Sequence, residues 1–486
     1  MAISILIKDP NFTGQKAEIY YYDIGDYLDR NQKLDIIKRF KSVENIPFTR
    51  IVPNQFDDWI NHRDESFDKF MEIGDKKLKF KPEIKSESIF EAFSMGISTS
   101  RDVWVYNFSK ANLEKNMTSM IENYNYEVEK REKDERYKPT TDKTKVNWSR
   151  ALTNDFNKKL KFDFKKDGKI ITSLYRPFTK CHLYLAKHFN EMLCQMPKLF
   201  PPQEKSYEYL PNLTILVNDG SGNFGALITD KTSDNHTFPQ TQAFPLYYYE
   251  KVETKGTLFD NGEEVGYQRK DAIRNYALSE FQKHYDDETI GKEDIFYYIY
   301  ALLHNKAYIA KYKNNLTKSL PRIPFAPKFW EFSKIGRELA NLHLNYESIK
   351  ANEQVRIKIK GESGADLFSK AVKVELNSDD YRVKKMKFGG NAKNKDKSVI
   401  IYNDKITLEN VPLKAYDYVV NGKSAIEWIM ERYCVSTDKD SGIKNDANLY
   451  SDDPKYILNL LLSVIEVSVK SVDLINALPS EFCDEK

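Results

Sequence analysis

A glycine-rich loop at the end of a strand-like run is the feature that most limits how this chain can fold. The apolar run Leu213 to Val217 leads into a loop where Gly220, Gly222 and Gly225 spell G-x-G-x-x-G. A dinucleotide or S-adenosylmethionine loop has this spacing, but it also needs a helix that starts at the last glycine. The sequence that follows, ALITDKTSDNH, has no helical pattern. The pattern therefore favours a hairpin turn or an exposed loop over a cofactor site.

Other catalytic motifs have little support in the sequence. Ser221 lies in G-S-G and not in G-x-S-x-G, so a nucleophile elbow is not indicated. Glu83-Ile-Lys85 matches only half of a nuclease motif, and such short patterns arise by chance in a chain with 30% charged residues. The sequence has no Asn-Pro-Pro-aromatic tetrad, which amino-methyltransferases use to hold the exocyclic nitrogen of a flipped base. It also has no G-x-x-x-x-G-K-[ST] loop, which binds the phosphates of ATP. We therefore expect no catalytic residue, and no enzymatic activity of this chain alone.

Length and composition predict a globular chain of two to four domains, because it has 486 residues of which 41% are hydrophobic. The 75 lysines and arginines nearly balance the 72 aspartates and glutamates, giving a net charge of +3. Local segregation of charge therefore matters more than the sum. Lysines gather at 158–166 and at 384–397, and such flexible cations suit contacts to phosphates as well as an ordinary solvated surface.

The cysteines indicate a reducing compartment. Cys181, Cys194, Cys434 and Cys483 lie far apart in the sequence, without a C-x-x-C pair. We expect free thiols and no structural zinc. The chain does not open with a signal segment, and its longest apolar run is too short for a membrane span. These features predict a soluble, cytoplasmic protein with no membrane partner.

Hydrophobic periodicity predicts a mixed α+β fold. Strands are expected at 2–7 and 16–24 as a hairpin or as neighbours, at 103–108, and as a pair within 398–408. Pro177 excludes a regular helix through 170–185. The first strand could belong to a sheet whose other members are missing. Helices are expected at 31–40, 111–129, 272–312, 332–342, 425–433 after a capping box at Ser424, and 456–474. The highly charged segment 127–169 is expected to be a helix end and linker, with a domain boundary near 135 to 145.

Several long strings carry a family resemblance: GISTSRDVWVYNFS (96–109), SLYRPFTKCHLYL (173–185), FPLYYYE (244–250), EDIFYYIYALLHNKAYIAKY (293–312), LPRIPFAPKFWEFSKIGRELANLHLNYE (320–347), YVVNGKSAIEWIMERY (418–433) and SGIKNDAN (441–448). Together they resemble the C-terminal part of type ISP restriction–modification enzymes. In that family one polypeptide joins a nuclease, a helicase-like ATPase, an adenine N6-methyltransferase and a target recognition domain.

The resemblance implies a division of the chain. Residues 1–135 resemble the C-terminal portion of the α/β methyltransferase domain, after its catalytic tetrad, which would make it a partial domain. Residues 145–486 resemble an α+β target recognition domain with a helical C-terminal part. Because the catalytic motifs of the family are absent here, S-adenosylmethionine, ATP and Mg are expected for the complete enzyme and not for this chain.

The implied function is sequence-specific recognition of double-stranded DNA, which would position a target adenine for N6-methylation by a catalytic core outside this chain. The expected partners are DNA and the methyltransferase, helicase and nuclease portion of the same system. Polar and arginine side chains are the candidates for contacts to bases, and cations are the candidates for contacts to phosphates. The predicted base contacts are Asn218, Asp219, Ser221, Asn223 and Arg176. The predicted phosphate contacts are Lys180, Lys187, Lys384, Lys385, Lys387 and Arg101.

Two other classes of function stay open at this point. The chain could be an S-adenosylmethionine-dependent DNA adenine methyltransferase that uses the Gly220–Gly225 loop, in which case it would bind that cofactor alone. It could also be a docking module for a separate methyltransferase subunit. Binding to random duplex DNA with a steep salt dependence would argue against a pure docking module.

Overall fold

A computed structural model describes residues 4–8, 10–11, 13–14, 17–26, 28–82, 84–201, 210–220, 222–253, 265–362, 374–391 and 394–484. The chain forms two compact units, Met1–Glu65 and Ser66–Lys486. The predicted boundary at 135–145 lies inside the second of these units. Each unit is described by itself.

The first unit contains helix α1 (Arg30–Phe40) and the strands β1 (Ile19–Tyr21) and β2 (Thr49–Ile51). Asp29 caps α1, because its side chain accepts from Gln32 N–H while the Gln32 side chain accepts from Asp29 N–H. The helix predicted at 31–40 is therefore confirmed. It buries none of its residues.

The predicted pairing of the first two strands is wrong for the residues that the structure describes. Residues 4–8 belong to no strand. Strand β1 pairs instead with β2, antiparallel, with Tyr20 opposite Arg50. The partner of β1 thus follows α1 in the sequence, and the alternating pattern of a strand does not reveal which other strand it will join.

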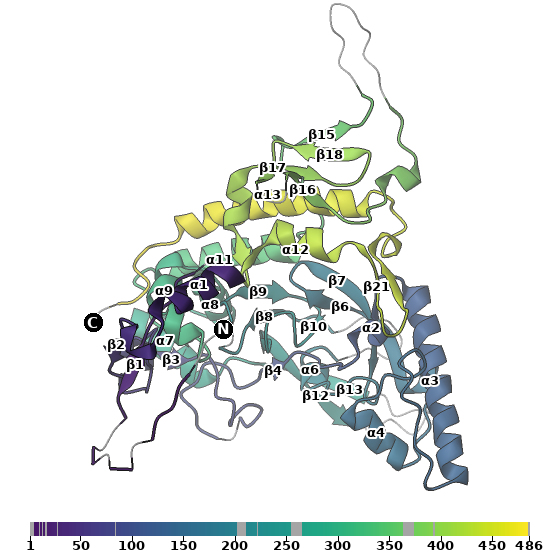
Figure 1. Ribbon diagram of the computed structural model, residues 1–486, viewed down its shortest axis with the longest axis horizontal. Helices are drawn as coiled ribbons and strands as arrows, with labels where there is room; N and C mark the ends of the chain where they lie inside the picture. The colour runs from purple at the N-terminus through teal and green to yellow at the C-terminus, as the bar shows by residue number, and fades with distance from the viewer. Residues whose placement is uncertain are drawn as a thin grey trace, which may run out of the picture. The chain divides into compact units, whose positions relative to one another are not determined.

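Two four-stranded sheets lie at the centre of the second unit (Figure 1). The first has the order β10-β6-β7-β5, in which β10 runs parallel to β6 and the other pairs are antiparallel. The second has the order β4-β11-β8-β9 and is antiparallel throughout. Their bounds are β4 Ser94–Met95, β5 Tyr106–Asn107, β6 Gly168–Arg176, β7 Thr179–Ala186, β8 Thr214–Val217, β9 Ala226–Thr229, β10 Thr232–Ser233 and β11 Gln242–Pro245.

Helices surround these sheets, and the long helix α13 is the last element of the chain (Figure 1). Their bounds are α2 Asp102–Val105, α3 Lys110–Lys133, α4 Arg150–Asn157, α5 Phe164–Asp167, α6 Met196–Leu199, α7 Asn275–Tyr285, α8 Lys292–Leu302, α9 Lys306–Lys311, α10 Lys313–Leu316, α11 Phe329–Leu344, α12 Ala425–Arg432 and α13 Tyr456–Ala477. Helices α8 and α11 approach closely at Gly336, where a Cβ would overlap the Tyr297 carbonyl oxygen. Only glycine permits this approach, because any other side chain would collide with the backbone of α8.

A third four-stranded sheet, of order β15-β18-β17-β16, lies beside α13 at the top of Figure 1. The remaining strands form pairs: β12 with β13, β3 with β14, β19 with β20 and β21 with β22. Their bounds are β3 Met71–Glu72, β12 Tyr247–Glu253, β13 Val265–Asp271, β14 Arg322–Ile323, β15 Arg356–Ile359, β16 Lys387–Gly390, β17 Lys395–Ile401, β18 Ile406–Glu409, β19 Val419–Val420, β20 Lys423–Ser424, β21 Val435–Thr437 and β22 Lys444–Asp446.

The predicted mixed α+β class is confirmed by these elements. The capping box predicted at Ser424 is present, with Glu427 as its partner, and α12 starts directly after it. The predicted helices 111–129 and 456–474 match α3 and α13. The strand predicted at 103–108 is wrong over most of its length, because α2 occupies its first half and only β5 is extended. Apolar residues in a short run cannot distinguish a buried helix turn from a strand.

Candidate nucleic-acid interface

The glycine-rich loop connects two antiparallel strands. Strands β8 and β9 pair along their whole length, with Val217 opposite Ala226. Inside the loop, Gly225 N–H donates to Asn218 Oδ1 at 3.2 Å. The hairpin predicted for this stretch is therefore confirmed. Since a strand and not a helix follows Gly225, the loop lacks the helix N-terminus that a bound pyrophosphate or S-adenosylmethionine would need, and it does not fit that cofactor.

The glycines of this loop allow close packing. Gly220 and Gly222 have φ angles of 68° and 76°, in the left-handed region that favours glycine. A Cβ on Gly220 would lie 2.6 Å from the Lys318 carbonyl carbon, and one on Gly225 would lie 2.9 Å from Asn421 N. The spacing that resembles a cofactor motif thus serves the contact of this hairpin with two later segments of the chain.

The predicted base contacts in this loop lie in different environments. Asn218 is 1% exposed, so it cannot reach a base in this conformation. The Asp219 carboxylate accepts from Lys76 Nζ on one oxygen and from Gln242 Nε2 at 3.4 Å on the other. Ser221 lies outside the described residues. Asn223 is exposed. Among the predicted base contacts of this loop that the structure describes, it is the one classed as exposed to solvent.

Arg176, the fifth predicted base contact, lies in a buried ion-pair network. Its Nη1 donates to Asp234 Oδ1 at 2.8 Å and its Nη2 donates to Asp102 Oδ2 at 3.2 Å. The guanidinium also lies 3.9 Å from the centroid of the Tyr175 ring. Burial lowers the pKa of Arg176, but Tyr175 and the two aspartates outweigh that effect and raise it. These contacts hold the arginine inside the protein, and we do not propose it as a base contact.

The two aspartates could not be identified from the sequence. Asp102 precedes Arg176 by 74 residues and Asp234 follows it by 58, so neither pairing leaves a local signal. Asp234 is 1% exposed, and a carboxylate so deeply buried requires a cation beside it. Tertiary contacts therefore account for the position of Arg176.

Arg101 and Lys180 are also held by the protein. Arg101 is 2% exposed, and its guanidinium donates to the backbone oxygens of Asn147 at 3.1 Å and Phe189 at 2.8 Å. Burial lowers the pKa of Arg101 to about 10. Lys180 Nζ donates to Glu347 at 2.7 Å, with only 15% of its side chain exposed. We do not propose either residue as a phosphate contact.

The other predicted phosphate contacts lie at the surface. Lys187, Lys384, Lys385 and Lys387 are all exposed. The last three form what we call the 384–387 lysine cluster, on the segment that leads into β16. Its backbone is fixed, because Lys384 O accepts from Val435 N–H of β21 at 3.0 Å. Flexible cations on a rigid backbone are suited to contacts with phosphates.

Neighbouring bonds hold this segment against the β21–β22 hairpin. Asn448 Oδ1 accepts from Val383 N–H and Asn448 Nδ2 donates to Val383 O, both at 2.8 Å. Arg382 Nη2 donates to Asp446 Oδ2 at 2.8 Å. Two further exposed cations lie on or beside the hairpin: Lys444, 3.6 Å from Asp446, and Lys143, paired with Asp440 at 2.6 Å. This part of the surface is therefore rich in cations that the fold orders.

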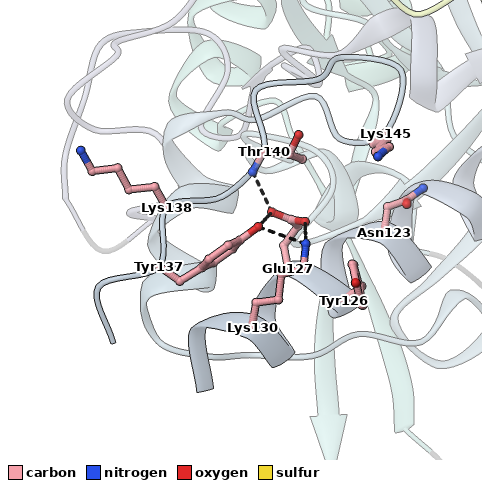
Figure 2. Close-up of a pocket in the computed structure, with 8 residues that line it drawn as sticks. All are labelled: Asn123, Tyr126, Glu127, Lys130, Tyr137, Lys138, Thr140 and Lys145. Carbon is pink, nitrogen blue, oxygen red and sulfur yellow. Dashed lines mark hydrogen bonds and ion pairs between the residues drawn. The ribbon is translucent and has the colours of Figure 1, made fainter. Parts of the chain in front are cut away.

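The charged segment predicted as a linker folds back on α3. Figure 2 shows Glu127 accepting from Thr140 N–H at 2.7 Å and from the Tyr137 hydroxyl at 2.8 Å, with Lys130 at 3.3 Å. Burial raises the pKa of Glu127, but these hydrogen bonds outweigh it and hold the pKa below its ordinary value. Trp148 Nε1 donates to Thr140 O at 2.7 Å. The segment is thus part of the folded second unit.

This fold-back encloses a polar cavity of about 310 Å³ (Figure 2). Its lining residues are Asn123, Tyr126, Glu127, Lys130, Tyr137, Lys138, Thr140 and Lys145. A second cavity, of about 590 Å³, includes Tyr247, Arg269 and Tyr297 in its lining. None of the predicted contact residues lines either one.

Several general features of the described residues bear on the type of site. They contain no group of three or more His, Cys, Asp or Glu side chains placed to hold a metal ion. Cys181, Cys194, Cys434 and Cys483 form no disulfide. Within the described part of the chain, no helix has the length and apolar content that crossing a membrane requires.

Comparison with known proteins identifies relatives that match nearly the whole chain. Residues 88–460 match the model of the Type ISP C-terminal specificity domain. Curated protein sequences yield no match. Among solved structures, a nuclease-deletion mutant of the Type ISP enzyme LlaGI in complex with a DNA substrate mimic is similar at 36% identity and a TM-score of 0.79. It is matched over 97% of this chain and 34% of its own.

Two further structures agree with this match. The ATP-dependent Type ISP enzyme LlaBIII bound to DNA is 37% identical, with a TM-score of 0.80, over 96% of this chain and 28% of that one. The DrdV–DNA complex is 28% identical, with a TM-score of 0.77, over 96% of this chain and 43% of that one. This chain thus spans less than half the length of each of these structures. The match over residues 88–460 shows that the chain belongs to the Type ISP C-terminal specificity domain family.

Proposed function

We propose that this chain recognises a specific sequence in double-stranded DNA, as the specificity part of a Type ISP restriction–modification system. The observation that supports it is the similarity over 96–97% of the chain, at 36–37% identity, to two Type ISP enzymes solved with DNA or a DNA mimic. Membership of the specificity domain family is independent support.

The 384–387 lysine cluster is our proposed phosphate-binding element. Its three side chains are exposed, and no carboxylate within salt-bridge distance of any of them is found among the described residues. A lysine held by a carboxylate would have to break that bond to reach a phosphate, whereas these lysines would not. Lys187 is exposed in the same way and is a second candidate. Each phosphate that a cation neutralises releases counterions and steepens the salt dependence of binding.

The catalytic steps would take place in another part of the system. We propose that the bound chain positions a target adenine for N6-methylation by that part, which would also use S-adenosylmethionine, ATP and Mg. The glycine hairpin does not fit S-adenosylmethionine, and the sequence has no G-x-x-x-x-G-K-[ST] loop for ATP. The first unit offers a surface for that partner, because α1 carries Leu34 and Ile37 at 42% and 48% exposure. The cytoplasm, where free cysteines persist, is the proposed location.

The test uses the full chain and a fluorescein-labelled random duplex, followed by anisotropy as the salt concentration rises. We expect binding at low salt, with a log–log slope whose magnitude is about 0.9 per phosphate that the protein neutralises. In the variant Lys384→Gln, Lys385→Gln, Lys387→Gln the slope should therefore become shallower by about 2 to 3. A matched control removes the same charge from exposed lysines of α7, α10 and α11: Lys283→Gln, Lys313→Gln, Lys334→Gln.

The outcomes separate the candidate functions. Equal slopes for the two triple variants would show that the lysine cluster does not contact phosphates. No binding at low salt would contradict DNA recognition by this chain and favour a docking module. Stoichiometric, tight binding of S-adenosylmethionine in calorimetry would instead support the methyltransferase alternative.

A further inference from the structure

Three loops from distant parts of the second unit lie against one another. They are the glycine hairpin loop 218–225, the loop 235–241 and the turn at 421–422. A Cβ on Gly422 would lie 2.5 Å from the Asn223 amide nitrogen, so the hairpin loop lies directly on this turn. A Cβ on Gly222 would lie 3.6 Å from the Pro239 ring, so loop 235–241 also lies against the hairpin loop. The three together form one continuous surface, which we call the three-loop surface.

The three-loop surface presents polar side chains to solvent. Asn223, His236 and Gln240 are all exposed, and the His236 side chain is 64% exposed. Two of the three are amides, which carry a donor and an acceptor in a fixed relation. This combination suits the recognition of a base edge, because an Asn or Gln amide can form two hydrogen bonds with N6 and N7 of adenine in the major groove.

The backbone beneath these side chains is rigid. Asp234 N–H donates to Leu174 O at 3.1 Å and Thr241 N–H donates to Asn235 O at 3.0 Å, which fixes both ends of loop 235–241. Thr241 Oγ1 accepts from Phe238 N–H at 2.8 Å and closes the tip. Side chains on a loop held in this way lose little further freedom on binding, which favours specific contacts.

Gln240 has an unusual conformation for its residue type. Its φ angle is 53°, and it follows Pro239 in a turn that Thr241 closes. Proline followed by a residue with positive φ is the pattern of a type II turn, where the second central position favours glycine or asparagine. The 421–422 turn, in contrast, has the residues that positive φ angles favour, because Asn-Gly is the usual pair for a two-residue hairpin connection. The fold thus holds Gln240 in a position that favours glycine, so replacing it with glycine should relieve the backbone rather than strain it.

We propose that Gln240, with Asn223 and His236 beside it, reads base edges in the major groove. This inference rests on the proposed function and names the side chains that would supply its specificity. Asn223 comes from one loop and the other two from the next, so the reading surface exists only in the folded chain. Ser221 is not part of the proposed set.

The test is a selection experiment with the full chain and a duplex library that has a randomised central segment. The wild-type chain should enrich one consensus sequence. Gln240→Gly removes the amide and also relieves the backbone, so it should fold well while losing preference at one or two adjacent positions. Its affinity for the wild-type consensus should fall by about 5- to 100-fold, the range for one bidentate base contact. Gln240→Glu should shift the preferred base at the same position toward cytosine, whose N4 donates to a carboxylate.

The control is Gln354→Glu, which makes the same change of charge at an exposed glutamine outside the three-loop surface and should leave the consensus unchanged. Asn223→Ala provides a second variant and should relax a position next to the one that Gln240 reads. If the wild-type chain enriches a consensus and all Gln240 variants retain it, the inference is wrong while the proposed function stands. If the wild-type chain binds the library without enriching any sequence, the proposed function itself fails.

Discussion

Two groups of cations that the sequence presents alike have opposite positions in the fold. Arg176 is 13% exposed and lies between two aspartates, and Lys180 is 15% exposed and bound to Glu347. Lys384 and Lys385 are exposed, on a segment whose backbone bonds to β21. Every one of these cations lies near aromatic or glycine residues in the sequence. The difference is that only the first group faces carboxylates contributed by distant segments.

Pairing with a buried carboxylate separates the cations that support the fold from the cations that a ligand can reach. A buried cation with an anionic partner stabilises the fold and has no free donor for a phosphate. An exposed cation on an ordered backbone contributes little to stability but is available to a ligand. Stability and DNA binding should therefore respond to different substitutions, which gives the comparison a direct test.

The largest effect is expected from Arg176→Met. Removing the guanidinium leaves Asp234, whose side chain is 1% exposed, with only the exposed His236 imidazole at 3.7 Å in place of its hydrogen-bonded cation. We expect the free energy of unfolding, measured by urea titration, to fall by about 3–5 kcal/mol. Arg176→Lys, which keeps the charge, should have a smaller effect. A stable Arg176→Met protein with impaired DNA binding would reverse our assignment of this residue.

A change of pH tests the interior through its histidines. Burial lowers the pKa of His304 from its ordinary 6.5 to about 4, and His343 beside it is lowered as well. The unfolded chain therefore binds these protons first, so stability is complete above pH 6.5 and is lost as the pH falls toward 4. His304 alone should account for about 3 kcal/mol of that loss.

The measurement compares urea unfolding at several pH values for the wild-type chain and for His304→Phe. The variant should show a smaller loss between pH 6.5 and 4, even if its stability at neutral pH is lower. Parallel curves for the two proteins would mean that His304 does not titrate in this range in the folded state.

A moderate effect is expected from Lys180→Met. The pair with Glu347 is only partly buried, with 15% and 29% of the two side chains exposed. Glu347 also keeps its hydrogen bond from the Tyr456 hydroxyl at 2.8 Å, so it retains a partner. We expect a loss of about 1 kcal/mol in unfolding free energy. A loss as large as that of Arg176→Met would show that this pair belongs with the fully buried network.

The smallest effect on stability is expected from the triple substitution of the 384–387 lysine cluster. The three side chains are exposed, so the free energy of unfolding should stay within about 0.5 kcal/mol of the wild type. The same protein should show the reduced salt dependence of DNA binding described above. A clear loss of stability would indicate that these lysines support the fold, and the contrast between the two groups would then disappear.

Local patterns were sufficient for much of the fold. Helices α1, α3, α11 and α13 were predicted from their apolar periodicity, and α12 was predicted from the capping box at Ser424. The β17–β18 pair was predicted because its strands are neighbours in the sequence, whereas for the β6–β7 pair the sequence excluded only a helix across Pro177. Prediction failed where pairing is distant, as for β1 with β2, and in the charged segment after α3. There a glutamate and a tyrosine, Glu127 and Tyr137, form contacts that a high charge density does not suggest.

The candidate site could be predicted only in part. Asn223 and the 384–387 lysine cluster are exposed as a contact requires, whereas Asn218 and Arg101 are buried. Exposure depends on which segments pack over a residue. The sequence around Asn218 or Arg101 does not indicate that other segments cover these two residues. The availability of Gln240 also depends on packing, because Gln240 is exposed whereas Thr237 and Thr241 of the same polar segment are buried.

The α+β class, the position of the glycine hairpin and the family resemblance could all be inferred from the sequence, because they depend on residue types that are close together along the chain. The segments that the glycine hairpin packs against become visible only in the folded chain. Gly220 and Gly225 are required by segments about 100 and 200 residues later, at Lys318 and Asn421. In the folded chain Asn218 is buried, Asn223 is exposed, and Gly222 lies near Pro239, which precedes Gln240. Such long-range packing is set by how whole elements fit together.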